Sequence, residues 1–299
     1  MRKSLIFSSF IIKIVALVTM TFDHVGLLLR TLYPYNYDIT QLSNVFRSIG
    51  RLALPLFVFM IIEGVIHTKN FKKYILRLGI MAIIISGFLA LITYVDFGID
   101  ASSLAHAGNI FIDLLLVALS AYLLGHKKIW VKLLSLLPIA VAITCFIVKG
   151  YQYQTGEIIY WYPNWLYLQY DWFSLLLGVG FFFAYKLGQK YIAYMEDKNG
   201  MPKEVWDVNG NQRLLVNIIN VFVLMISSLL FYSMKFIWQG GVYWDASNQL
   251  LAILSGALIL LYNGKRGYNA KWFQYGAYLY YPLHILIIIL VAMIASGGY

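Results

Sequence analysis

The residues from Lys13 to Gly26 constrain the fold of this 299-residue chain most strongly, because they place ionisable groups inside an apolar run. The run, residues 10–32, is long enough to cross a bilayer, which takes about 20 residues. It contains Lys13, Asp23 and His24. A Lys or Asp near the centre of a spanning helix costs about 2.5–3.5 kcal/mol on insertion scales. A membrane helix that keeps such groups usually directs them into the protein or into an aqueous cavity.

The spacing of Lys13 and His24 places both residues on one face of such a helix. Eleven steps of about 100° make three turns plus about 20°, and a rise of about 1.5 Å per residue separates them by about 16 Å. We interpret this face as a polar line through the membrane, with His24 as a base near its outer end. The alternative is an amphipathic helix in which Lys13 reaches the interface and Asp23 and His24 pair.

The composition indicates an integral membrane protein. Only 12% of the residues are charged and 61% are hydrophobic, whereas a soluble domain has about 25% charged residues. The first apolar run is too long for the apolar part of a signal peptide and has no small-residue cleavage site after it, so we expect it to remain as the first span. The single cysteine, Cys145, excludes a disulfide within the chain.

Hydropathy predicts an all-α polytopic bundle of about nine spans, formed by residues 1–299 as one domain. The predicted spans are 10–32, 52–67, 74–95, 105–124, 129–149, 171–188, 213–235, 247–262 and 272–296. A tenth is expected if residues 150–170 hold a short or re-entrant helix.

The basic residues give the orientation of this bundle. With the N-terminus inside, seventeen of the 23 Lys and Arg residues fall in inner segments, five fall in outer segments and Lys13 lies within a span. This distribution follows the positive-inside rule and predicts a cytoplasmic N-terminus. The net charge of +10 therefore needs no nucleic-acid partner.

The outer and inner loops differ in composition. Residues 33–37 and 151–170 are rich in Tyr and Trp, which is typical of an interfacial aromatic belt and equally suits the wall of an acceptor site. Residues 196–212 form the clearly hydrophilic stretch, which we expect as a cytoplasmic loop.

Further polar residues fall within or beside the later spans. Arg47 and Arg51 are four residues apart and share a helix face, as headgroup anchors or as an anion site. Glu63 lies inside the second span. His284 follows Pro282 in the last span, where it is either an interhelical hydrogen-bonding group or a base.

The inner loop after the second span is basic. Its four basic residues, Lys69, Lys72, Lys73 and Arg77, lie at a cytoplasmic membrane edge and attract phosphates, of lipid headgroups or of a soluble ligand. The sequence has no Walker A motif, dinucleotide fingerprint or Gly-x-Ser-x-Gly elbow, and the five histidines show no metal-ligand spacing, so we expect no metal.

Together these stretches resemble the TraX family, the conjugative F-pilin N-acetylase and its relatives. The likeness rests on residues 12–26, on Arg47-x-Ile-Gly-Arg51-Leu-Ala-x-Pro55-Leu-Phe, on Glu63-Gly64 with Thr68-x-Asn70, on Lys73-Tyr74 and Arg77-Leu78, on Gly108-Asn109, on Tyr262-Asn-Gly-Lys265-Arg266-Gly267 and on Tyr281-Pro-Leu-His284. Between about 125 and 245 only Tyr170-Asp171-Trp172 contributes. The spacing of Lys13 and His24 is also similar to that in the large family of membrane O-acyltransferases that act on bacterial polysaccharides.

The resemblance implies transfer of an acetyl or other short acyl group from cytosolic acyl-CoA. The acceptor would be an amine or hydroxyl at or beyond the outer face, on a peptide N-terminus, a glycan or a small molecule. It also implies a multi-pass protein of the cell membrane, the cytoplasmic membrane of a bacterium.

The residues suit this chemistry. We expect His24 to be the general base, Asp23 its electrostatic or structural partner and Arg51 the group that stabilises charge on the acyl carbonyl. Glu63 and His284 are the second choices for the base. The candidate residues for binding acyl-CoA and its phosphates are Lys13, Arg47, Asn70, Lys72, Lys73, Arg77, Lys265 and Arg266.

Two other function classes remain open. One is a proton-coupled secondary transporter that uses Asp23, Glu63 and histidines as a proton relay, although the chain lacks the repeated halves typical of many transporters. The other is a non-catalytic accessory protein of the membrane.

Overall fold

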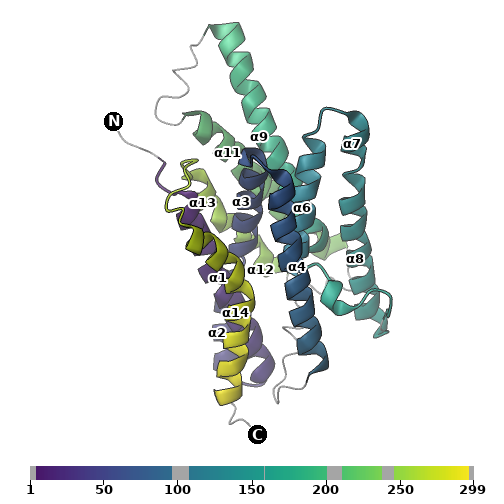
Figure 1. Ribbon diagram of the computed structural model, residues 1–299. Coiled ribbons are helices and arrows are strands. Elements are labelled where there is room, and N and C mark those ends of the chain that lie inside the picture. The colour runs from purple at the N-terminus through teal and green to yellow at the C-terminus, as the bar shows by residue number, and fades with distance from the viewer. Residues whose placement is uncertain (1–4, 96–107, 158, 201–210, 238–245, 296–299) are drawn as a thin grey trace.

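The computed structural model describes residues 5–95, 108–157, 159–200, 211–237 and 246–295 (Figure 1). Their regular structure is helical, apart from one isolated parallel bridge between Phe7 and Tyr262. The first three residues of the predicted span 105–124, and residues 201–210 of the predicted hydrophilic loop, lie outside these ranges.

The described residues form twelve α-helices and two 3-10 helices. In chain order they are α1 (Ser9–Leu32), α2 (Tyr37–Gly50), α3 (Ala53–His67), α4 (Phe71–Tyr94), α6 (Ile110–Leu124), α7 (Ile129–Leu133), α8 (Leu136–Thr155), the 3-10 helix η1 (Asn164–Leu166), α9 (Asp171–Asn199), α11 (Asn211–Ile237), α12 (Ala246–Gln249), the 3-10 helix η3 (Leu250–Ser255), α13 (Gly256–Leu260) and α14 (Lys271–Ala295).

The predicted all-helical membrane bundle is confirmed. Seven helical segments of the described residues are long and apolar enough to cross a membrane, and two shorter apolar helices, Ile110–Leu124 and Leu250–Leu260, lie where two further spans are predicted. The predicted number of nine is therefore approximate. Large apolar side chains on the outside, such as Ile83, Trp130 and Ile294 at 74%, 76% and 81% exposure, suit a surface covered by lipid.

Figure 1 shows the start of α1 and the end of α14 at opposite ends of the bundle. We name the end where α1 begins the inner end and the end where α1 stops the outer end, following the predicted topology. Residues 6–10 pair with the connection before α14 at the inner end, where Ser9 N–H donates to the Lys265 carbonyl and Phe10 N–H to that of Arg266. These bonds satisfy donors that the start of a helix leaves without partners.

Residues 37–50, which lie between the first two predicted spans, form the helix α2, and hydropathy does not predict it. Asn36 caps this helix by accepting from the Ile39 N–H. The buried positions of α2 are Ser43 and Gly50, so it packs through small residues and lacks the apolar run that predicts a span.

α2 packs closely along the outer half of α1. A Cβ atom at Gly26 would lie 2.9 Å from the Ser43 carbonyl oxygen, and one at Gly50 would lie 2.3 Å from the Asp23 Cβ. Ser43 also donates a hydrogen bond to the Gly26 carbonyl at 2.7 Å. Such close helix contact through small residues is common in membranes, and here it brings the start of α3 against Asp23.

Candidate active site

His24 on α1 and His284 on α14 form a buried pair. The two helices run in the same direction, and a hydrogen bond of 2.7 Å joins the hydroxyls of Thr21 and Tyr280 one turn before the histidines. The Nδ1 of His24 lies 2.8 Å from the Nε2 of His284, and the side chains are 1% and 4% exposed. The structure thus joins two predicted site residues that are 260 positions apart in the sequence.

The hydrogen bonds determine the tautomers of this pair when both rings are neutral. The Nδ1 of His284 lies 2.9 Å from the Tyr280 carbonyl oxygen and therefore carries the hydrogen. Its Nε2 then accepts from the Nδ1–H of His24, so the Nε2 of His24 has a free lone pair. This atom is buried and has no hydrogen-bond partner among the described residues. The arrangement leaves a proton acceptor in place inside the bundle.

Asp23 pairs with Arg51 instead of His24. The Arg51 Nη2 donates to the Asp23 Oδ1 at 2.5 Å, and Arg51 also donates to the Gln249 side chain at 3.3 Å and to the Arg47 carbonyl at 3.1 Å. Both side chains of the ion pair are almost fully buried. Pairing offsets part of the cost of burying two charges. The structure therefore places a bound carboxylate and a guanidinium beside the histidine pair.

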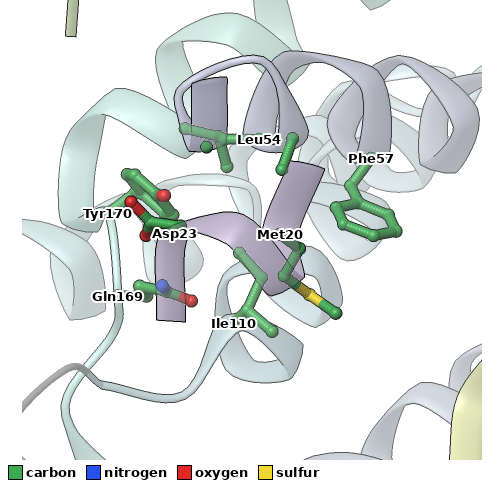
Figure 2. Close-up of a pocket in the computed structure, with 9 residues that line it drawn as sticks. Met20, Asp23, Leu54, Phe57, Ile110, Gln169 and Tyr170 are labelled. Carbon is green, nitrogen blue, oxygen red and sulfur yellow. The ribbon is translucent and has the colours of Figure 1, made fainter. Parts of the chain in front are cut away.

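A small cavity of about 10 Å³ adjoins Asp23, with room for about one water molecule. Figure 2 shows Asp23, Gln169 and Tyr170 together on one side of it and the apolar Met20 and Ile110 on the other. Met20 lies one helical turn before His24. The cavity thus reaches the histidine-bearing part of α1.

Glu63 lies in a separate cluster near the inner end. Its carboxylate accepts from Arg213 at 2.8 Å, and the Arg213 guanidinium lies 4.4 Å from the centre of the Tyr262 ring. Glu63 is ten residues after Ala53, about 15 Å along α3. The structure therefore does not bring this second-choice base to His24.

Most of the predicted phosphate-binding residues lie at the inner end. Lys72 and Lys73 are exposed in the first turn of α4, which Asn70 caps by accepting from the Lys73 N–H. Arg77 lies 6.0 Å from the centre of the Tyr275 ring on α14.

The second cationic group at this end surrounds the start of α1. Lys265 and Arg266 are exposed in the connection that pairs with Ser9 and Phe10, and Lys13 follows on α1. Arg47 is different, because it packs against Gly26 near the other end of α1: its Cγ would lie 3.0 Å from a Cβ at that glycine. Gly26 is thirteen residues after Lys13, about 20 Å along the helix. It therefore does not join the inner cations.

Three further buried polar residues of this region are not among the predicted site residues. They are Gln249, which contacts Arg51, and Asp113 and Lys149, which both bind the backbone of residues 168–170. Asp113 lies inside the predicted span 105–124, and an ionisable residue at such a position is itself a signal of function. Lys149 is at the outer end of the predicted span 129–149. Nothing in the sequence indicates that Gln249 contacts Arg51.

Comparison with known proteins gives two matches. The sequence model of the family described as TraX protein matches residues 8–197. The "Probable fimbrial assembly protein FimC, serogroup H1" of Dichelobacter nodosus is 32% identical over 123 residues, which is 40% of this chain. The chain matches 48% of that relative, about half of its length. No solved structure matches the chain.

Proposed function

Because this chain belongs to the TraX family, we propose that it is a membrane-embedded acyltransferase. It moves an acetyl or other short acyl group from cytosolic acyl-CoA to an amine or hydroxyl acceptor at or beyond the outer face of the cell membrane. The similarity to a protein named for fimbrial assembly supports a peptide N-terminus as the acceptor.

The observation that carries this proposal is the buried His24 Nε2, which has no hydrogen-bond partner among the described residues. The hydrogen bond to His284 assigns the ring hydrogen to the Nδ1 and so leaves a lone pair on this Nε2. The acceptor nitrogen or oxygen attacks the thioester carbonyl carbon while the His24 Nε2 takes its proton. The C–S bond then breaks, and the CoA thiolate leaves with that proton. General-base help of this kind is typically worth about 10²–10⁴ in rate.

The neighbouring charged and polar groups have supporting roles in this reaction. His284 holds the His24 ring and its tautomer through the 2.8 Å hydrogen bond. Arg51, held by Asp23, stabilises the negative charge that develops on the acyl oxygen.

The cations at the inner end support binding of the acyl donor. Lys72, Lys73 and Arg77 on α4, and Lys13 with Lys265 and Arg266 beside α1, offer ammonium and guanidinium groups to the phosphates of CoA. Lys13 and His24 are about 16 Å apart along α1, which the extended pantetheine arm would cover to bring the thioester to the base.

The test uses acetyl-CoA labelled in the acetyl group and inverted membrane vesicles, which expose the cytoplasmic face and retain the native acceptors. Vesicles that contain the protein should transfer label to an acceptor, and vesicles with His24→Ala should not. His126→Ala is the matched control, since His126 lies in the turn after α6 and accepts only from the local Lys128 N–H among the contacts described for it. Equal incorporation with and without the protein would overturn the proposal.

A further inference from the structure

The segment between α8 and α9 enters the membrane region without forming a regular α-helix. Asn164, in η1, donates to the Thr93 hydroxyl at 3.3 Å, next to the outer end of α4. Further along, the Tyr167 carbonyl accepts from the Asn109 N–H, and the Asn109 side chain donates to the Ala82 carbonyl. Ala82 is twelve residues before the end of α4, about 18 Å deeper. Residues 164–170, named here the re-entrant segment, thus run inward to mid-membrane depth.

Backbone without helical hydrogen bonds at this depth is tolerated only where it is buried in protein or lines a cavity. The re-entrant segment meets both conditions, because Tyr167, Leu168 and Tyr170 are buried while Gln169 and Tyr170 line the cavity beside Asp23 (Figure 2). It also reaches a depth similar to that of His24, which lies eight residues, about 12 Å, before the end of α1.

One carboxylate holds the inner end of the re-entrant segment. Asp113 on α6 is 0% exposed and accepts from the backbone N–H of Gln169 at 2.6 Å and of Tyr170 at 3.1 Å. It also accepts from the Ser174 hydroxyl at 2.7 Å, in the first turn of α9. Because Asp113 binds the backbone N–H groups of both Gln169 and Tyr170, it fixes the backbone there and so orients the side chains of these two residues.

A second set of contacts holds the same backbone from α8. The Lys149 ammonium donates to the Leu168 carbonyl at 2.8 Å and to the Asp171 carboxylate at 3.0 Å. Asp171 has φ +48°, in the left-handed region that a residue with a side chain rarely adopts. Gly108 has φ +88°, and a Cβ atom added there would lie only 2.6 Å from the Leu168 carbonyl oxygen. Such conformations persist where the surroundings over-determine them, and they cluster at functional sites.

We propose that Gln169 and Tyr170 form the wall of the acceptor subsite and govern acceptor binding next to His24, with Asp113 as the positioning residue of that wall. The inference rests on the proposed acyl transfer. It assigns the acceptor side because the re-entrant segment enters from the outer end, whereas the cations suited to CoA lie at the inner end. The amide of Gln169 and the phenol of Tyr170 both donate and accept hydrogen bonds, which suits a polar acceptor with N–H or O–H groups.

The test measures acceptor-dependent CoA release by the purified full chain, with a free-amine synthetic peptide and glucosamine as the two probes. Gln169→Ala and Tyr170→Phe are expected to raise the KM of the probe that is used at least fivefold and to leave the KM of acetyl-CoA within twofold. Asp113→Asn should shift the acceptor KM in the same direction. Tyr160→Phe is the matched control on the same connection, because the Tyr160 side chain is 88% exposed.

The outcomes separate this inference from the function on which it rests. A wild-type protein that releases no CoA with either probe would count against the proposed function and against the inference with it. Normal wild-type turnover, with an unchanged acceptor KM in Gln169→Ala and Tyr170→Phe, would overturn the inference alone. If the KM values of the acceptor and of acetyl-CoA changed equally, the re-entrant segment would have only a structural role, and this result would also overturn the inference.

Discussion

At the scale of single residues, hydrogen bonds to His284 and to the Tyr280 carbonyl hold the two histidines. Sequence reasoning selects His24 and His284 separately, because an ionisable residue inside an apolar span is costly. It does not pair them, since the partners lie on helices at opposite ends of the chain. It also predicts Asp23 as the partner of His24, although neighbouring side chains on a helix point about 100° apart. The structure instead shows Asp23 bound to Arg51.

Substitution of His284 tests the tautomer argument. His284→Gln keeps an oxygen that can accept from the His24 Nδ1–H, whereas His284→Leu removes it. We expect His284→Leu to lower kcat by about tenfold or more, within the usual scale of general-base effects, and His284→Gln to retain more activity. Measurement of kcat at saturating acetyl-CoA decides this. Equal activity of the two variants would show that the hydrogen bond does not orient His24.

At the scale of helices, the close contact of α1 and α2 sets the position of Asp23. The sequence predicts α1 and α3 well, because both are apolar runs. It misses α2, whose buried face is made of small residues and whose Tyr-rich start is typical of a loop. The spacing of polar residues along a single helix was thus predictable, and the fit between two helices was not.

Glycine substitutions test this contact. Gly50→Ala should lower the thermal unfolding temperature in detergent, because the new Cβ would meet Asp23 and overpacking typically costs about 1–3 kcal/mol. Gly79→Ala on α4 is the matched control, since nothing lies within 4 Å of a Cβ there. It should be neutral or slightly stabilising, as Ala favours a helix over Gly by about 1 kcal/mol. The same response from both variants would contradict the close packing at Gly50.

At the scale of the whole molecule, the bundle separates cations at its inner end from a small cavity beside Asp23, nearer its outer end. Hydropathy predicts the helical bundle, with an approximate number of spans. The orientation given by the distribution of Lys and Arg stays a prediction. The re-entrant segment was expected only in outline, since its Tyr- and Trp-rich composition fits an aromatic belt equally well. Its depth follows from Asp113, Lys149 and Gly108, whose partners no local pattern reveals.

The inner cations give a prediction about donor binding. Replacement of Lys72 and Lys73 together by Ala should weaken acetyl-CoA binding and reduce its dependence on salt, because exposed charges act through a screened field. Lys127 and Lys128, an exposed pair in the turn after α6, give the matched double variant and should have little effect. Titrations across a salt series report both quantities. Affinity that stays at the wild-type value throughout would remove Lys72 and Lys73 from the donor site.

The most direct test of the account measures acetyl-CoA consumption by folded, purified protein with a competent acceptor. The wild-type chain is compared with His24→Ala and with Glu63→Gln, which changes a buried carboxylate in the separate cluster with Arg213. The account predicts that His24→Ala loses turnover by about a hundredfold or more, while Glu63→Gln keeps most of it. Near-full turnover in His24→Ala together with loss in Glu63→Gln would contradict the assignment of His24 as the base.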